Sequence, residues 1–194
     1  MTTPSTRVAT ASPEAPAGVP AQGGRAASGA HRPGSPDLLR AAFRQHAAGV
    51  AVITGTHPVT GVPVGFTATS LNSVSAEPPL LSFSIGTGSS SWPAVSEEGS
   101  GLVGVHVLGE EQGALAGLFA RSGADRFGPG TGWAPGPHGV PVLAGAQAWL
   151  VCRIRSRIAA GEHRVIIAEV VAGAARGEGR PLLYHQGRFN ALRD

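Results

Sequence analysis

The chain has 194 residues, of which 42% are hydrophobic and 14% charged, a composition typical of a globular protein with room for one domain and a tail. All 15 basic residues are arginines, which excludes a Schiff-base lysine and the lysine of a phosphate-binding loop. The formal net charge is only +3, and beyond residue 35 the basic and acidic residues nearly balance. We therefore expect no binding to nucleic acid, which needs a strongly basic surface.

Cysteine content and the lack of long apolar runs limit the class of protein further. The single cysteine, Cys152, cannot form an internal disulfide or a CxxC motif. Its apolar neighbours Leu150 and Val151 predict a buried, unreactive thiol. No apolar run reaches the roughly 18 residues that a membrane helix needs, and no signal peptide is evident. These observations predict a soluble, cytoplasmic protein without membrane contact.

The first 35 residues differ in composition from the rest of the chain. Residues 1–35 are mostly Ala, Pro, Gly, Ser and Thr, with almost no large apolar side chains. Such a segment buries too little surface to offset its ordering entropy, so we expect a disordered tail. One folded domain is expected over residues 36–194.

Three short helices are expected in this domain. Ser35 suits the N-cap of the first helix and Pro36 suits its first position, and the apolar spacing that follows predicts an amphipathic helix over residues 36–47. Gly49 is the expected stop. The other two helices are expected at residues 91–98 and 110–121.

Short strand-like runs separated by Gly, Pro and Asn make up most of the remaining chain. The segment HPVTG (57–61) is expected to form a hairpin turn between the first two runs. Six or seven strands with few helices predict a mainly β fold, an antiparallel barrel or sandwich rather than a parallel sheet. Arg153, Arg155 and Arg157 alternate along one run and are expected on one solvated face. The strand-like runs cover residues 50–55, 62–69, 80–85, 102–108, 146–160, 163–175 and 181–189.

Two hydroxyl-rich segments, residues 67–75 and 84–91, each end or follow a predicted strand. Small side chains let a flat ligand approach the backbone, whose N–H and C=O groups can pair with the polar edge of a heteroaromatic ring. The second segment leads into an expected helix, so serine hydroxyls and helical N–H groups there can hold a phosphate. The pattern suits a phosphorylated aromatic cofactor; ordinary surface loops have the same composition.

Other motifs for cofactors and metals do not occur in the sequence. It has no GxGxxG after a strand, no GxxxxGK[ST] and no GxSxG nucleophile elbow. The seven histidines are dispersed without HxxxH or HExxH spacing, and no metal site is expected. His163 differs from the others because it lies in a tight Gly161-Glu162-His163 turn between two long predicted strands. An exposed turn histidine is the structural alternative to a functional one.

Several segments in order resemble the short-chain flavin reductase family, which comprises the reductase components of two-component flavin monooxygenases. The resemblance covers residues 36–192, and no single segment of it is diagnostic. Its segments are GVPVGFTATSLNSVSAEPPLLSFSI, SSSW, LVGVHVLGEEQGALAGLFA, the Arg126-Phe127 pair, GVPVL, AWLVC, GEH and PLLYHQGRF.

This resemblance implies an FMN-binding split β-barrel with a few short flanking helices, in a homodimer that has the flavin near the subunit interface. It also implies an NAD(P)H:flavin oxidoreductase that transfers hydride from NADH or NADPH to FMN or FAD. The reduced flavin is then supplied to a flavin-dependent monooxygenase.

The resemblance also implies roles for individual residues. His163 matches the histidine of the family's Gly-Asp-His turn, on the nicotinamide side of the pocket, and is the candidate catalytic residue. Glu162 departs from that turn, and His106 stands where the family commonly has Asn. The candidate flavin-binding residues are Thr67, Ala68, Thr69 and Ser70 along the isoalloxazine ring, Ser73, Val74 and Ser75 further along the flavin, Ser84, Ser89, Ser90 and Ser91 at the ribityl and phosphate groups, and Phe127.

Two alternatives to a flavin reductase stay open from the residues alone, because a fold does not determine a function. One is a non-enzymatic flavin-binding or haem-binding protein on the same barrel. The other is a split-barrel redox enzyme that uses a different ligand, such as a pyridoxal-like or deazaflavin compound.

Overall fold

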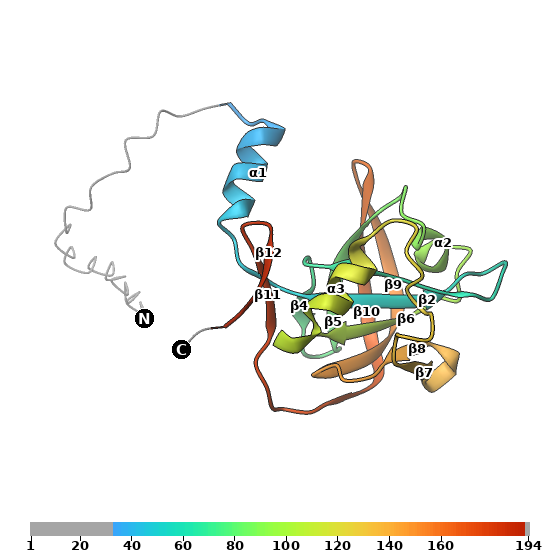
Figure 1. The fold of residues 1–194 in the computed structure, drawn as a ribbon. Coiled ribbons are helices and arrows are strands. Elements are labelled where there is room, and N and C mark those ends of the chain that lie inside the picture. The colour runs from blue at the N-terminus through green and yellow to red at the C-terminus, as the bar shows by residue number, and fades with distance from the viewer. Residues whose placement is uncertain (1–32, 193–194) are drawn as a thin grey trace, which may run out of the picture. The chain divides into compact units, whose positions relative to one another are not determined.

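In the computed structural model, residues 33–192 are described, and they form antiparallel strands with a few short helices (Figure 1). The chain divides into two units, Met1–Pro33 and Gly34–Asp194, and the second contains all of these elements. The predicted tail, residues 1–35, lies outside the described residues apart from its last three. The strands are β1 (Ala48–Gly49), β2 (Ala51–Thr56), β3 (Pro63–Ala68), β4 (Asn72–Ser75), β5 (Leu80–Gly86), β6 (Leu102–Val107), β7 (Trp133–Pro135), β8 (Pro141–Leu143), β9 (Ala148–Ala160), β10 (His163–Ala175), β11 (Leu182–His185) and β12 (Arg188–Ala191). The helices are α1 (Pro36–Arg44), α2 (Trp92–Val95), α3 (Gly113–Ala120) and the 3-10 turns η1 (Glu110–Gln112) and η2 (Pro137–Gly139).

Seven strands form the principal sheet in the order β3-β2-β6-β9-β10-β5-β4, and all neighbouring strands are antiparallel. Along β5 the side chains of Leu81, Phe83 and Ile85 are buried and their neighbours are half-buried, as expected of a strand with one face toward the core. Two small sheets, β1-β11-β12 and β7-β8, complete the domain. The predicted mainly β, antiparallel fold with few short helices is confirmed.

The principal sheet curls so that β3 and β5, which are far apart in the strand order, come together. Ser70, just after β3, accepts a hydrogen bond at Oγ from the N–H of Ser84 in β5 (2.9 Å). Ser91, after β5, donates from its buried hydroxyl to the carbonyl oxygen of Gly65 in β3 (3.0 Å). These two bonds join the strands across a seam, an arrangement consistent with a split barrel.

Two clusters of buried apolar side chains lie on opposite faces of β2, because alternate residues of a strand point to opposite sides. Ile53 belongs to the first cluster, together with Phe83 and Ile166. Val52 belongs to the second cluster, which includes Phe119 of α3. Burial of each large apolar side chain contributes about 1.5–3 kcal/mol. Burial on both sides of β2 therefore holds α3 and the β7-β8 region against the curled sheet.

His106 of β6 is a fully buried hydrogen-bonding link within this core. Its Nδ1 lies 3.1 Å from the carbonyl oxygen of Val52, and its Nε2 accepts a hydrogen bond from the N–H of Leu143 (3.1 Å). Because Nε2 accepts, the single proton of the neutral ring is on Nδ1 and is donated to Val52. Burial lowers the pKa of His106 from 6.5 to about 4. His106 therefore joins β2 to β8 as a neutral ring.

The ends of several predicted elements differ in the structure. Helix α1 has its predicted start, with Ser35 Oγ accepting from the N–H of Leu38, but it ends at Arg44 rather than at residue 47. Gly49 is not a helix stop; it lies in β1 and pairs with Leu183 of β11, a partner that local sequence patterns cannot show.

The predicted strand over residues 181–189 is a hairpin of β11 and β12. Gln186 and Gly187 form its turn, with φ values of 51° and 82°. The predicted helix at residues 91–98 keeps only Trp92–Val95, because Ser96 is extended. The segment 110–121 divides at Gly113 into η1 and α3. Strands β4, β7 and β8 have four residues or fewer, too short for a periodic pattern to predict.

The three arginines of β9 do not share one face, which corrects the prediction from their alternation. A β-bulge at Arg155 shifts the register with β10, so that Arg157 pairs with the buried Ile166. Arg155 is exposed and forms an ion pair with Glu169. Arg157 instead reaches the end of α2, where its Nε donates to the carbonyl oxygen of Val95 (2.6 Å). Because of the bulge, Arg157 holds the end of α2 by a hydrogen bond instead of facing solvent.

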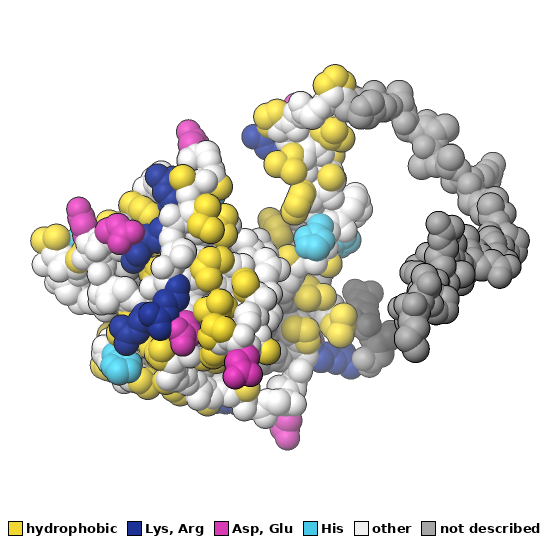
Figure 2. All heavy atoms as spheres, turned by 180° about the vertical axis from the view of Figure 1, so that it is seen from behind, with side chains coloured by type: hydrophobic (Ala, Val, Ile, Leu, Met, Phe, Trp, Pro, Cys, Tyr) yellow, Lys and Arg dark blue, Asp and Glu magenta, His cyan; other side chains and the backbone are white. Residues whose placement is uncertain are grey.

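The apolar side of α1 is not covered by the rest of the described chain. Leu39 and Phe43 are 60% and 64% exposed, and no residue of α1 is buried. Figure 2 shows hydrophobic side chains gathered over this helix. No helix within residues 33–192 is long and apolar enough to cross a membrane.

Candidate active site

The open edge of β3 faces the curled seam and supplies backbone hydrogen-bonding groups. The N–H of His57 bonds to the carbonyl oxygen of Val62 at the predicted hairpin, and bonded pairs alternate from there along β2 and β3. That alternation directs the backbone groups of Gly65 and Thr67 away from β2, in agreement with the bond from Ser91 to Gly65. The N–H and C=O of Thr67 therefore face the seam.

The opposite side of the seam is the edge of β5 beyond its short partner β4. β4 covers β5 only over Leu80–Ser82, so the rest of that edge has no strand beside it. The N–H of Ser84 points to the seam, where it donates to Ser70. Two strand edges with free or serine-bonded polar groups thus face each other. A planar ring with donors and acceptors on its rim can pair with such edges.

A pocket of about 340 Å³ lies along this seam. It contains no carboxylate side chain, so its polar character comes from hydroxyl groups, the imidazole and the backbone. The pocket brings together Thr67–Ser70 of the first hydroxyl-rich segment, Ser84 and Ser89 of the second segment, and His163. The pocket is lined by Phe66, Thr67, Ala68, Thr69, Ser70, Ser84, Ile85, Gly86, Ser89 and His163.

His163 reaches the pocket because of the register between β10 and β5. It is the first residue of β10 and pairs directly with Gly86, the last residue of β5. A Cβ at Gly86 would lie 3.6 Å from His163 Nε2, so the imidazole rests against the glycine backbone. Thr87 holds the turn, since its N–H and its hydroxyl both donate to the carbonyl oxygen of Glu162 (2.9 and 3.1 Å). These contacts place the ring at the mouth of the seam.

The hydroxyl groups of the site are of two kinds. Some donate their proton to an acceptor in the protein, and others only accept a hydrogen bond. Thr67 donates its hydroxyl to the carbonyl oxygen of Ala116 in α3 (2.7 Å), and Ser91 donates to Gly65. Ser70 and Ser89 only accept, Ser70 from Ser84 and Ser89 from the N–H of Ser91 (3.2 Å). Their hydroxyl protons have no acceptor within residues 33–192, so they can be donated to a ligand.

The remaining predicted site residues lie outside the seam pocket. Ser73 and Ser75 line a neighbouring, more apolar hollow of about 280 Å³, and Val74 between them is half exposed. Ser90 is exposed next to the pocket residue Ser89. Phe127 packs on Phe119 and Trp133 in the second apolar cluster. The structure brings the predicted Thr67–Ser70, Ser84, Ser89 and His163 together and leaves the others at its periphery or in the core.

Sequence reasoning did not select Phe66, Ile85 and Gly86, which also line the pocket. In the sequence, Phe66 and Ile85 are ordinary apolar residues of predicted strands, and no local pattern distinguishes them from core residues. The only available signal was Gly86, a glycine at a strand end where another group approaches the backbone.

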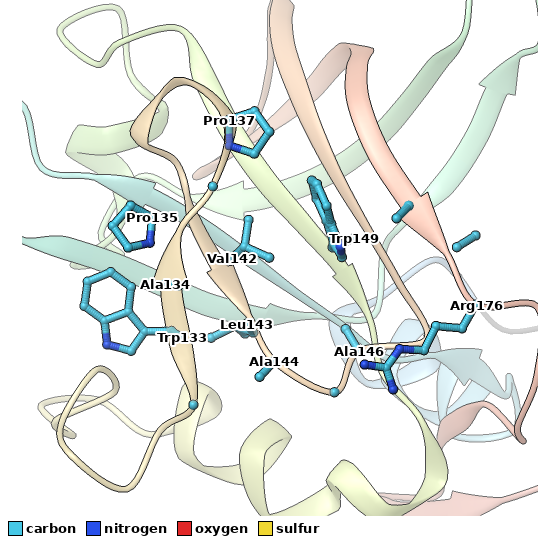
Figure 3. A pocket seen from close by; sticks show the side chains of 15 residues that line it. Trp133, Ala134, Pro135, Pro137, Val142, Leu143, Ala144, Ala146, Trp149 and Arg176 are labelled. Atoms are coloured by element: carbon cyan, nitrogen blue, oxygen red, sulfur yellow. The ribbon is translucent and has the colours of Figure 1, made fainter.

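A larger cavity of about 560 Å³ lies at the other end of β10 (Figure 3). The 13 residues of β10 separate the two sites, since His163 at its start lines the seam pocket and Ala174 and Ala175 at its end line this cavity. The lining of this cavity is mostly apolar and includes Trp149 and Val142. Arg176 is directed toward Ala146 (Figure 3). The cavity lacks the hydroxyl-rich edges, so we place the candidate active site at the seam despite the smaller volume.

The thiol of Cys152 does not contribute to the site. Cys152 is buried in the first apolar cluster, and burial raises the pKa of its thiol to about 12. Residues 33–192 contain no cluster of three or more side chains that could hold a metal ion.

A curled antiparallel sheet with a hydroxyl-lined pocket between two strand edges is consistent with a small split-barrel protein. The chain belongs to the flavin reductase like domain family, whose model matches residues 43–193. The family predicted from the resemblance is confirmed, and with it the enzyme class, flavin oxidoreductase.

Relatives and a solved structure show how far the similarity extends. An NADH:FMN oxidoreductase of Rhodococcus qingshengii is 46% identical over 154 residues, 77% of this chain and 78% of that protein. The reductase subunit HsaB of a flavin-dependent monooxygenase of Rhodococcus jostii is 36% identical over 157 residues, 81% of this chain and 78% of that protein. The NADH:FAD oxidoreductase SgcE6 of Streptomyces globisporus, solved with NAD and FAD fragments, has a TM-score of 0.74 and 30% identity, covering 81% of this chain and 92% of that one.

Proposed function

We propose that this chain is an NAD(P)H-dependent flavin reductase that binds FMN or FAD in the seam pocket. The observation that carries the proposal is the convergence of Thr67–Ser70, Ser84, Ser89 and His163 between two open strand edges. A bound flavin supplies the redox chemistry, because its ring accepts a hydride from a nicotinamide. The names of two relatives, one an NADH:FMN and the other an NADH:FAD oxidoreductase, support NADH as donor and both flavins as acceptors.

In this proposal the protein binds and orients the two ring systems. The N–H and C=O of Thr67 and the hydroxyl of Ser70 hold the polar rim of the flavin, and the pre-oriented N–H groups stabilise negative charge on the reduced ring. His163 lies at the pocket mouth, where it positions the nicotinamide or its ribose against the flavin. Hydride transfer from nicotinamide to flavin is chemistry of the two cofactors, so we assign His163 to positioning and no residue to an obligate acid or base role.

The test combines purified protein with each pairing of NADH or NADPH with FMN or FAD and follows the loss of nicotinamide absorbance. The proposal expects turnover with at least one pairing. If no pairing is turned over, the proposed reductase activity is rejected. The two alternatives, a flavin-binding or haem-binding protein and an enzyme that uses another ligand, would then be favoured.

Delivery of reduced flavin to a flavin-dependent monooxygenase is the second part of the proposal. It is supported by the similarity to a monooxygenase reductase subunit. A cytoplasmic location, where NADH is available, is part of the same proposal. A two-component monooxygenase supplied without its own reductase should turn over when this chain, NADH and flavin are added. Failure of that coupling despite rapid NADH oxidation would reject delivery but not reduction.

We also propose that the chain forms a homodimer through α1. The exposed Leu39 and Phe43 on this helix support an apolar contact with a second copy, because large apolar patches rarely face water in soluble proteins. Replacing both with Glu should convert a dimer to a monomer in light scattering. Val59→Glu, at an 84% exposed apolar residue in the hairpin turn, is the matched control. A monomeric wild-type protein would reject the dimer.

A further inference from the structure

The cavity of about 560 Å³ at the end of β10, called the tryptophan cavity below, is a second hollow of ligand size (Figure 3). It is lined by residues 132–137, 142–146, 149 and 174–176, and it shares no lining residue with the seam pocket. Its volume lies within the range of sites that enclose small organic molecules. The flavin chemistry proposed for the seam therefore leaves this cavity without a role.

The β7-β8 wall of the tryptophan cavity is fixed to the principal sheet by buried hydrogen bonds. Thr54 of β2 donates its hydroxyl to the carbonyl oxygen of Pro141 (2.6 Å). His106 of β6 accepts from the N–H of Leu143 (3.1 Å). These two bonds hold both ends of β8, so the cavity is formed before any ligand enters it. A preformed site binds without the entropic cost of ordering its walls.

Two indole rings line the cavity, and their N–H groups differ in availability. Trp133 donates from Nε1 to the carbonyl oxygen of Phe127 (3.1 Å). Trp149 Nε1 has no acceptor within residues 33–192, and it is not among the buried unpaired atoms of that part of the chain, so it is accessible. In Figure 3, Trp133 and Pro135 lie on one side of the cavity and Trp149 on the other. Such walls suit a planar aromatic ring.

Arg176 provides the one charged side chain among the lining residues of the cavity. It directly follows β10, and its backbone N–H donates to the carbonyl oxygen of Gln147 (2.8 Å), which fixes its position at the rim. Its guanidinium is exposed and forms no ion pair or hydrogen bond with a side chain or backbone group of residues 33–192. A guanidinium without a counter-ion is suited to bind a carboxylate through two parallel hydrogen bonds.

We propose that the tryptophan cavity binds a small aromatic carboxylate, with its ring between Trp133 and Trp149 and its carboxylate at Arg176. The apolar interior selects the ring, and the unpaired cation at the rim selects the negative charge. A neutral ring of the same shape gains the apolar contacts alone and binds less tightly. The proposal does not depend on flavin binding, because the two sites have no residue in common.

The first test is isothermal titration calorimetry of the full chain with 2-naphthoate and with 2-naphthamide, which has the same ring without the charge. Wild-type protein should bind one 2-naphthoate per chain, and more tightly than 2-naphthamide. Arg176→Gln should weaken 2-naphthoate binding by about 3- to 10-fold, as expected for a bidentate but exposed ion pair, and 2-naphthamide binding by less than about 2-fold. The matched control is Arg188→Gln, at an exposed arginine of β12 outside the cavity, which should change neither affinity.

The second test places the ring, by filling the cavity with Ala174→Leu. Ala174 is exposed, lines the cavity and pairs with Trp149 on the neighbouring strand, so a leucine there would occupy the space beside the indole. Both compounds should bind at least about 10-fold more weakly, because the ring loses its apolar contacts. Ala159→Leu, at an exposed alanine of β9 away from the cavity, should bind both as wild type does. Unchanged thermal unfolding shows that each variant has folded.

Each unfavourable outcome has a definite meaning. Equal affinities of the wild-type protein for the two compounds, or equal losses in Arg176→Gln, would overturn the role of Arg176. Competitive displacement of 2-naphthoate by FMN would place the compound in the seam pocket and overturn the separate site. Absence of binding to the wild-type protein would overturn the proposal, and conversion of a dimer to a monomer by Ala174→Leu would then assign the cavity to a second copy. Flavin reduction at the seam is measured separately and can succeed or fail independently.

Discussion

Acidification should destabilise the protein through His106, and the structure determines the sign. The ring is fully buried, and its pKa falls from 6.5 to about 4 in the folded state, so the folded protein favours the neutral form. The unfolded chain takes up a proton near pH 6.5, whereas the folded chain does so only near pH 4. The stabilisation is therefore fully present above pH 6.5 and is lost as the pH falls from there to 4.

The size of the effect follows from the same shift. Each pKa unit corresponds to about 1.4 kcal/mol, so the shift of His106 implies a loss of about 3 kcal/mol across this range. Denaturant unfolding at several pH values measures it in wild-type protein and in His106→Asn, which has no ring to titrate. The variant should be less stable at pH 7 by about 1–3 kcal/mol if Leu143 N–H or Val52 C=O loses its partner. Its stability should fall less steeply than that of wild type between pH 6.5 and 4.

The control for this comparison is His138→Asn. His138 is exposed and has a positive φ of 59°, a conformation that asparagine tolerates, so this variant should keep the wild-type slope. Identical slopes for wild-type protein and His106→Asn would refute the reasoning. So would a nitrogen-15 NMR titration that showed the folded His106 ring taking up a proton near pH 6.5.

Three further predictions concern the site, the seam and the thiol. His163→Ala should slow NADH oxidation while flavin affinity changes little, because the ring lies at the pocket mouth; unchanged reduction kinetics would contradict its role. Gly65→Ala should lower the free energy of unfolding by about 1–3 kcal/mol, since a Cβ there would lie 2.8 Å from Ile53 O and 2.9 Å from the Phe119 ring. Gly88→Ala, with nothing within 4 Å of the new Cβ, is the control and should be nearly neutral, so equal losses would argue against the clash. Cys152 should react with an aromatic disulfide reagent only after denaturation, because its pKa is raised to about 12 by burial; rapid reaction of the native protein would disagree with that burial.

Much of the fold and part of the site could be predicted from local patterns. Strand-length apolar runs separated by Gly, Pro and Asn placed β2, β5, β9 and β10 nearly at their observed bounds, and Ser35 and Pro36 marked the start of α1. The hairpin of β11 and β12 is local, and its Gln186-Gly187 turn was missed within a single predicted strand. The end of α1, where the carbonyl oxygen of Arg44 accepts from the N–H of Gln186, and the short strand β1, which pairs with β11, were not predictable because these partners are remote in sequence. The bulge at Arg155 likewise depends on register with β10, which alternation in one strand does not contain.

The sequence by itself determined a mainly antiparallel β domain, the absence of lysine chemistry and two hydroxyl-rich segments suited to a phosphorylated ring. Its family followed from the order of several segments, none of them sufficient alone. Only the tertiary structure decided which hydroxyl groups are available, because partners such as Ala116 for Thr67, Gly65 for Ser91 and Ser84 for Ser70 come from other elements of the fold. It also brought Arg126 to Ser90 across 36 residues of chain, a contact that no local pattern records. The physical reason is that these hydrogen bonds join segments that are distant in sequence, whereas a sequence pattern describes one segment at a time.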